Sequence, residues 1–218
     1  MAVAVSTVIG KARHLLNDGD ADNYRWQDVE LLAGLNSGQK EAAIHKTDIY
    51  TLTAAVLLVA GTKQTAPAGS TQIIDIYRNM GVAGSTPGNA IRIVPRHIMD
   101  TMTPDWHAST PAAVVRHAIF DERNPKVFWV YPPNTGTYIE LCYALVPPDA
   151  ALVGNITLDD IWETALVDYV TYRAMMKDSD DGVNQQTALA YYRNFLLSLG
   201  AKDAAEALYD PNRRRRGE

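Results

Sequence analysis

The segment TLDDIWETALVDYVTYRAMMKDSDDGVNQQTALAYYRNFLLSLG, residues 157–200, decides the fold of this chain because it predicts two helices joined by a short turn. In its first half, mostly apolar side chains recur every three or four residues, which puts them on one face of a helix. That face consists of Leu158, Ile161, Trp162, Ala165, Leu166, Tyr169, Val170, Arg173 and Met176. Thr157 and Asp160 resemble a capping box, which would satisfy free N–H groups in the first turn.

The second half of the segment predicts the returning helix. A polar run over residues 177–182 ends the first helix, and Gly182 is expected to turn the chain. Asn184 is expected to cap the second helix, which would end at Gly200. Its apolar stripe consists of Leu189, Tyr192, Leu196 and Leu199. Stripes of this kind are typical of a packed core, so the hairpin predicts a fold anchor without chemistry of its own.

Two further helices are predicted at the start of the chain, over residues 6–18 and 25–46. The inward side chains of the second are expected to be Trp26, Val29, Leu32, Leu35, Ala42 and Ala43. Gln39 is expected on its wet side. Gly34 and Gly38 each weaken such a helix by about 1 kcal/mol relative to alanine, and we expect them where another helix approaches closely.

From about residue 47 the apolar pattern changes from a period of 3.6 to a period of 2, which predicts strands. The predicted strands cover residues 48–53, 56–60, 61–65, 73–78, 91–94, 114–120, 127–131 and 138–146. The clearest predicted hairpin pairs 127–131 with 138–146 across the turn at 132–137. Many short strands separated by Gly, Pro, Ser and Asn favour a β-sandwich or a small barrel.

The predicted fold class is therefore α+β. The N-terminal helices, residues 1–46, and the C-terminal helical hairpin, residues 149–200, are expected to form one helical bundle. An inserted antiparallel β-sandwich or barrel-like domain is expected over residues 47–148. Residues 201–218 are expected to be weakly helical as far as Tyr209 and then to form a flexible, basic C-terminal tail.

The composition is that of a soluble globular protein, with 47% hydrophobic and 21% charged residues. No apolar run reaches the roughly 18–20 residues that span a bilayer, and no signal peptide is predicted, so we expect no membrane partner. The single cysteine, Cys142, lies in a predicted strand and cannot form an intramolecular disulfide. These features suit a protein made in a reducing cytoplasm.

The net charge of −5 conceals an asymmetry. Four consecutive arginines, Arg213, Arg214, Arg215 and Arg216, stand near the C-terminus, so the rest of the chain is more acidic than the total indicates. An acidic body repels nucleic acid, and the arginines alone can neutralise only a few phosphates. They suit either a solvated tail or an arm that docks on an acidic partner.

Catalytic and cofactor motifs are missing from the sequence. It contains no G-x-S-x-G, Walker-type loop, H-E-x-x-H or C-x-x-C. The ten-residue spacing of His97, His107 and His117 suggests a zinc site, but three imidazoles must converge and need supporting partners. We therefore predict no enzyme, no cofactor and no metal site.

Two acidic clusters are better explained by structure than by chemistry. Asp159, Asp160 and Glu163 stand at the start of a predicted helix, where negative charge stabilises the helix dipole. The run containing Asp178, Asp180 and Asp181 lacks the later glutamate of a calcium loop and predicts a solvated turn.

The order of the segments resembles that of the head-to-tail adaptor (connector, or head-completion) proteins of tailed bacteriophages, especially the short-tailed kind. The resemblance extends over nearly the whole chain to Gly200. It is carried by WQDVELL (26–32), LNSGQKE (35–41), GTKQ (61–64), IYRNMG (76–81), PDWH (104–107), FDERNPKVFWVYPP (120–133) and LVDYVTYRA (166–174).

The resemblance implies a structural virion protein with a helical bundle and an inserted β domain. Such adaptors assemble as a ring, typically of twelve copies, between the portal protein and the tail nozzle or tail tubular protein. The phage DNA passes through the channel during ejection without sequence-specific binding. Carried onto this chain, the resemblance implies a portal-binding C-terminal segment, with Arg213, Arg214, Arg215, Arg216 and Tyr209 as its candidate contacts.

Two other functions remain open at the level of the sequence. A nucleic-acid-binding module would use the β domain and the basic tail, and it needs an exposed aromatic strand face. The only cluster for such a face is Phe128, Trp129 and Tyr131. A hydrolase would have to act through His107 or His117 with a nearby acid.

Overall fold

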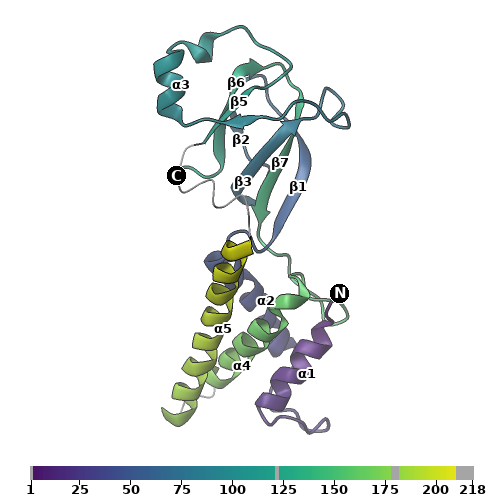
Figure 1. Ribbon diagram of the computed structural model, residues 1–218. Helices are drawn as coiled ribbons and strands as arrows, with labels where there is room; N and C mark the ends of the chain where they lie inside the picture. Colours follow the sequence, from purple (N-terminus) through teal and green to yellow (C-terminus); the bar gives the residue numbers. More distant parts are fainter. Residues whose placement is uncertain (1, 121–122, 178–181, 210–218) are drawn as a thin grey trace. The chain divides into compact units, whose positions relative to one another are not determined.

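The chain folds into two compact units, shown in Figure 1. One is formed by Thr47–Val146, and the other by the segments on either side of it. The computed structural model describes residues 2–120, 123–177 and 182–209, the last stretch with side chains for 185–200. Across these residues, no helix is both long and apolar enough to cross a membrane.

The helical unit is built from both ends of the chain. Its helices are α1 (Val5–Leu15), α2 (Asp28–His45), α4 (Glu163–Lys177) and α5 (Gly182–Tyr209), with a 3-10 turn, η2 (Asp160–Trp162), before α4. Helix α4 packs against α1, α2 and α5. Its buried face includes Leu166 and Val170, as the sequence pattern predicts. The two helices of the predicted C-terminal hairpin are present.

The ends of these two helices differ from the prediction. Thr157 does not form a capping box, because its hydroxyl donates to the carbonyl of Pro148 (2.8 Å). Ile161 and Arg173 are exposed, not part of the buried face. The sequence pattern predicted that the second helix ends at Gly200. Helix α5 instead continues through Gly200 to Tyr209. A glycine inside a long helix costs only about 1 kcal/mol, which does not terminate a helix by itself.

The buried stripe of α5 is also shifted from the predicted one. Leu189 is 51% exposed, and the buried side chains are Ala188, Phe195 and Leu199. The ring of Phe195 lies 5.0 Å from that of Tyr169 on α4. This aromatic contact, which the spacing of leucines did not reveal, sets the face that α5 turns toward α4.

Close approach of α2 and α4 confirms the expectation for the two glycines. A Cβ at Gly38 would lie 2.8 Å from the ring of Tyr169, and one at Gly34 would lie 3.7 Å from the Cβ of Arg173. Gln39, however, was wrongly predicted on the wet side, since only 1% of it is exposed.

The β unit contains two sheets. One has the strand order β1-β7-β3 and the other the order β2-β6-β5-β4. The strands are β1 (Thr51–Leu57), β2 (Gly61–Thr65), β3 (Ser70–Asn79), β4 (Arg92–Ile93), β5 (His117–Phe120), β6 (Val127–Asn134) and β7 (Tyr138–Leu145). Strands β4 and β5 pair in parallel, so the second sheet is mixed and not purely antiparallel. Among the described strands the sheets do not close into a barrel, and the fold class α+β is confirmed.

The predicted hairpin between 127–131 and 138–146 is wrong, because β6 and β7 belong to different sheets. The side chain of Asn134 holds the connection between them. Its Oδ1 accepts hydrogen bonds from the N–H groups of Gly136 (2.7 Å) and Thr137 (2.8 Å). Phe128 of β6 and Ile139 of β7 enter the same hydrophobic core from their separate sheets. Alternation predicts which side chains point inward, but not which strands pair.

A short helical segment covers part of the second sheet. It comprises α3 (Arg96–Met102) and the 3-10 turn η1 (Trp106–Ala108). Met99 and Trp106 form a small core with Ile119, and the half-buried Trp129 and Tyr131 pack against it.

Candidate functional site

The predicted portal-binding residues fall at the limit of the structure. Arg213, Arg214, Arg215 and Arg216 lie outside the described residues. Tyr209 is the last residue of α5, and its side chain is not among those described. The acidic turn containing Asp178, Asp180 and Asp181 also lies outside the described residues.

The three spaced histidines occupy separate environments. His97 is exposed on α3. His107 stacks on Trp106 (3.6 Å between ring centroids), and its Nδ1 is hydrogen-bonded to the Thr62 hydroxyl (2.9 Å). His117 lies on β5. Within the described part of the chain, no group of three or more His, Cys, Asp or Glu side chains is arranged to hold a metal ion.

The surroundings of His117 on β5 affect its protonation. Burial lowers its pKa below the usual 6.5, and the positive charges of Arg92 and Arg116 lower it further. A neutral ring therefore stacks beside Tyr131, with 6.0 Å between the centroids. These contacts are those of a side chain packed on a strand, and they give His117 a structural role.

The acidic cluster before α4 has structural contacts. Glu163, in the first turn of α4, forms an ion pair with Lys11 of α1 (2.7 Å). Asp159 is the residue before η2, and its side chain makes no capping bond there. The cluster therefore contributes charge at the start of a helix and a link between helices, as the sequence favoured.

The aromatic strand face required for nucleic-acid stacking is not free. Phe128 is 1% exposed and belongs to the core between the two sheets. Trp129 and Tyr131 are half-buried under the α3–η1 segment, and the Arg96 guanidinium lies over the Trp129 ring (5.6 Å). Much of each ring is therefore unavailable for stacking with a base.

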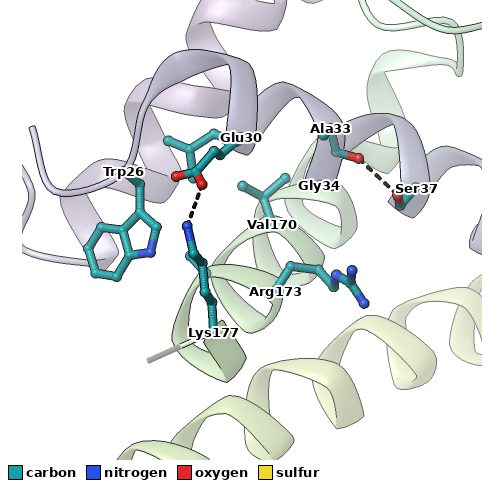
Figure 2. A pocket seen from close by; sticks show the side chains of 10 residues that line it. Trp26, Glu30, Ala33, Gly34, Ser37, Val170, Arg173 and Lys177 are labelled. Atoms are coloured by element: carbon teal, nitrogen blue, oxygen red, sulfur yellow. Dashed lines mark hydrogen bonds and ion pairs between the residues drawn. The ribbon is translucent and has the colours of Figure 1, made fainter. Parts of the chain in front are cut away.

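A groove of about 320 Å³ lies between α2 and α4 in the helical unit and is here called the α2–α4 groove (Figure 2). Gly34 on α2 faces Val170 on α4. Because Gly34 has no side chain, space is left between the two helices. The groove is lined by Trp26, Glu30, Leu31, Ala33, Gly34, Ser37, Val170, Arg173, Ala174 and Lys177.

An ion pair between Glu30 and Lys177 bridges one end of this groove. The hydrogen bond from the Lys177 ammonium lowers the pKa of the Glu30 carboxyl below its usual value, so the pair is charged at neutral pH. Figure 2 shows the Arg173 side chain extending from α4 away from that pair. The groove therefore combines an apolar floor with basic side chains.

Side chains of α2 also bind residues 150–158, the segment that follows the β unit. Asn36 accepts a hydrogen bond from the Ala150 N–H (2.8 Å) and donates to its carbonyl (3.1 Å). The Oε1 atom of the buried Gln39 accepts from the N–H groups of Thr157 (2.7 Å) and Leu158 (3.2 Å). Together with the backbone bonds between Val5 and Gly154 and between Ile156 and Val3, these bonds fix the segment that leads into α4.

A buried ion cluster fixes the connection between α1 and α2. The Arg13 guanidinium donates to the Asp18 carboxylate, to the carbonyl of Trp26 (2.8 Å) and to Asp28 (2.6 Å), and it lies over the Tyr24 ring. Asp18 also accepts from the N–H of Arg25 (2.8 Å). The arginine and Asp18 are both nearly inaccessible to water. Apolar periodicity did not identify Arg13 and misplaced Gln39, because it treats a polar residue as outward-facing.

Comparisons with known proteins place this architecture in a family. A family model described as SU10 adaptor protein matches residues 3–215. The chain is also similar to a solved structure titled "Neck of empty GTA particle computed with C6 symmetry". That similarity has 17% sequence identity and a TM-score of 0.28, over 78% of this chain and 79% of the other. A comparison with the curated proteins found no match. The family match over nearly the entire chain agrees with the predicted phage head-to-tail adaptor, and the chain belongs to the SU10 adaptor protein family.

Proposed function

We propose that this protein is the ring-forming adaptor between the portal and the tail nozzle of a short-tailed phage. The observation that carries the proposal is the family match over residues 3–215, which includes both units. In this proposal, copies of the chain, twelve in the ring that the resemblance implies, stand beneath the portal in the neck of the virion and surround the channel through which DNA leaves. The role is structural and not enzymatic.

The charge distribution supports this arrangement. The chain has a net charge of −5 despite the arginine run near its C-terminus. A channel wall with an acidic balance repels the phosphate backbone, so DNA slides through it without being held. The arginines are then available to form ion pairs with an acidic surface of the portal.

The portal contact is proposed for the segment after α5. In this proposal Arg213, Arg214, Arg215 and Arg216 form ion pairs with the portal, and Tyr209 anchors the base of the segment. Because α5 continues to Tyr209, a truncation at Gly200 would remove part of a helix together with the tail. A chain that ends at Tyr209 separates the two effects.

The test mixes the purified chain with the portal protein encoded in the same genome and images the mixture by negative-stain electron microscopy. The full chain is compared with the chain ending at Tyr209 and with a variant in which the four arginines are replaced by serine. A second ring beneath the portal, lost in both variants, is the expected result. Rings with all three proteins would move the contact onto the folded body. Absence of a ring with the full chain would refute the adaptor proposal, and a gel shift with DNA would then test the nucleic-acid alternative.

A further inference from the structure

The two sheets of the β unit have four outer strands, and three of them are protected against pairing with another chain. Strand β3 contains three register shifts and the charged residues Asp75 and Arg78. Strand β2 has five residues, with a register shift before Lys63. Strand β4 has only two residues, one of them Arg92. Short length, charge and irregular pairing are the usual means by which a protein protects a sheet edge.

Strand β1 has none of these protections. Its seven residues, TLTAAVL, include no charge. They pair with β7 from Thr51 to Leu57 without a register shift. Figure 1 shows β1 beside β7 as the outer strand of its sheet. Among the described sheet edges, β1 is therefore the long, regular and uncharged one.

The hydrogen-bonding groups that β1 presents outward follow from the bonds at its two ends. The N–H of Leu145 donates to the carbonyl of Tyr50 (3.0 Å), and the N–H of Leu58 donates to the carbonyl of Thr137 (3.0 Å). In an antiparallel ladder alternate residues face the partner strand, so the even-numbered residues between these bonds face β7. The N–H and C=O groups of Thr51, Thr53, Ala55 and Leu57 consequently point away from the sheet.

The hydrophobic core is also open along this edge. Leu52, Ala54 and Val56 stand opposite Tyr143, Leu141 and Ile139 of the core, respectively. Leu52 is nevertheless 45% exposed, and Ala54 and Val56 are only half-buried. A strand added beside β1 would bond to these outward-facing residues and cover this apolar row in the same step.

We infer that β1 receives an extended segment of another neck protein as a fourth strand of its sheet. The partner segment is about seven uncharged residues long, with aliphatic side chains at alternate positions that continue the row of Leu52, Ala54 and Val56. A charged segment is disfavoured because the edge offers no counter-charge over its whole length. This inference rests on the proposed ring.

The ring explains why the partner is not a second copy of this chain. Pairing of β1 with β1 has two-fold symmetry and would point neighbouring copies in opposite directions, whereas every copy in a ring beneath a portal points the same way. Pairing with another edge of a neighbouring copy would meet the charges and register shifts of β2 or β3. The chemistry of β1 therefore fits a strand from a different protein.

Hydrogen exchange measures the pairing directly. Amide exchange of the full chain is followed alone, bound to the portal, and in complete necks with the attached tail isolated from phage particles. We expect the amides of Thr53, Ala55 and Leu57 to exchange about tenfold or more slowly in the complete neck than in the free chain. Equal exchange in both states, with a ring present by microscopy, would overturn the inference and leave the adaptor proposal intact. Slowing that depends on the concentration of the free chain would also overturn it, because the occupant would then be a second copy.

Matched variants separate strand pairing from folding. Ala55→Pro removes one outward N–H without removing a bond to β7, which a sheet edge tolerates. Ala55→Lys keeps every backbone group and adds an edge charge, whereas Ala55→Ser keeps both the N–H and the neutrality. We expect all three to form rings on the portal, and only Ala55→Ser to retain the partner protein. If the proline and lysine variants both retained the partner protein, the inference would be overturned. If none of the three variants formed rings on the portal, Ala55 would be needed for the ring and not for binding a partner strand, which would also overturn the inference.

Discussion

Removing the Arg13 guanidinium tests whether a buried ion cluster holds the start of the helical unit. In Arg13→Met the aliphatic part of the side chain is largely kept, but the bonds to Asp18, Asp28 and the Trp26 carbonyl are lost. Only 4% of the Asp18 side chain is exposed, so its charge remains buried without its cation. Breaking one partner of such a pair costs about 3–5 kcal/mol. We expect a loss of this size in the free energy of unfolding.

The assay is urea unfolding followed by circular dichroism at the helical band, which reports mainly on the helical unit. The matched control is Lys40→Met, since Lys40 forms an ion pair of ordinary length with Asp149 (2.7 Å) while both side chains are about half exposed. An exposed pair contributes only about 0–1 kcal/mol. If Arg13→Met were no more destabilising than Lys40→Met, the cluster would not hold the α1–α2 connection and the reasoning would be refuted.

Three further outcomes follow from other contacts. Gly38→Ala should destabilise the protein by about 1–3 kcal/mol through overpacking against the Tyr169 ring. Gly10→Ala, with no atom within 4 Å of the new Cβ, should instead gain about 0.5–1 kcal/mol of helix propensity; equal effects in thermal unfolding would contradict the close helix approach. Gln39→Leu should cost about 1–3 kcal/mol because the N–H groups of Thr157 and Leu158 lose their acceptor, and stability unchanged in urea would disprove that role. The pKa of His117 is lowered in the folded protein, so this histidine takes up a proton at a higher pH in the unfolded chain than in the folded one. It should therefore reduce the free energy of unfolding as the pH falls below its usual pKa of 6.5. Comparing His117→Gln with the parent chain from pH 7.5 to 5 isolates that contribution, and parallel curves would exclude it.

The sequence predicted the helices well because their signal is local. Apolar residues at helical spacing identified α1, α2 and α4 to within a few residues of their observed ends. Close approach at Gly38 was also predictable. A glycine in the middle of a helix lowers its stability, so it indicates a place where a larger side chain would not fit. The end of α5 was not, because nothing local distinguishes a glycine that stops a helix from one that a long helix tolerates.

Strand pairing was the part that the sequence could not supply. The runs that became β6 and β7 have the length, alternation and intervening turn residues of a hairpin, yet they lie in different sheets. The difference depends on Asn134, whose side chain bonds to Gly136 and Thr137 and whose surroundings are buried. The sequence alone does not predict this turn, because its hydrogen bonds depend on the burial of Asn134 in the folded β unit. The predicted portal-binding arginines remain a prediction, since they lie outside the described residues.

Four of the buried polar side chains have a common role, which connects the fold to assembly. Arg13, Gln39, Asn79 and Asn134 each bond to backbone groups where the chain changes direction. Irregular backbone cannot satisfy its own N–H and C=O groups, so buried side chains do so. Asn79, for example, donates to the Val115 carbonyl and accepts from its N–H, both at 2.8 Å.

Connections held in this way are already ordered in the free chain. Association is weakened by the entropy of every loop that must order at an interface. A subunit whose connections are fixed beforehand therefore loses less on entering a ring, and most of the cost falls on the few segments that must still find a partner. In the proposed adaptor the contacts still to be made are those of the C-terminal arginines with the portal and of β1 with the partner strand. Assembly would then depend on the portal and on the next neck protein, because contacts between copies of the chain supply neither of these.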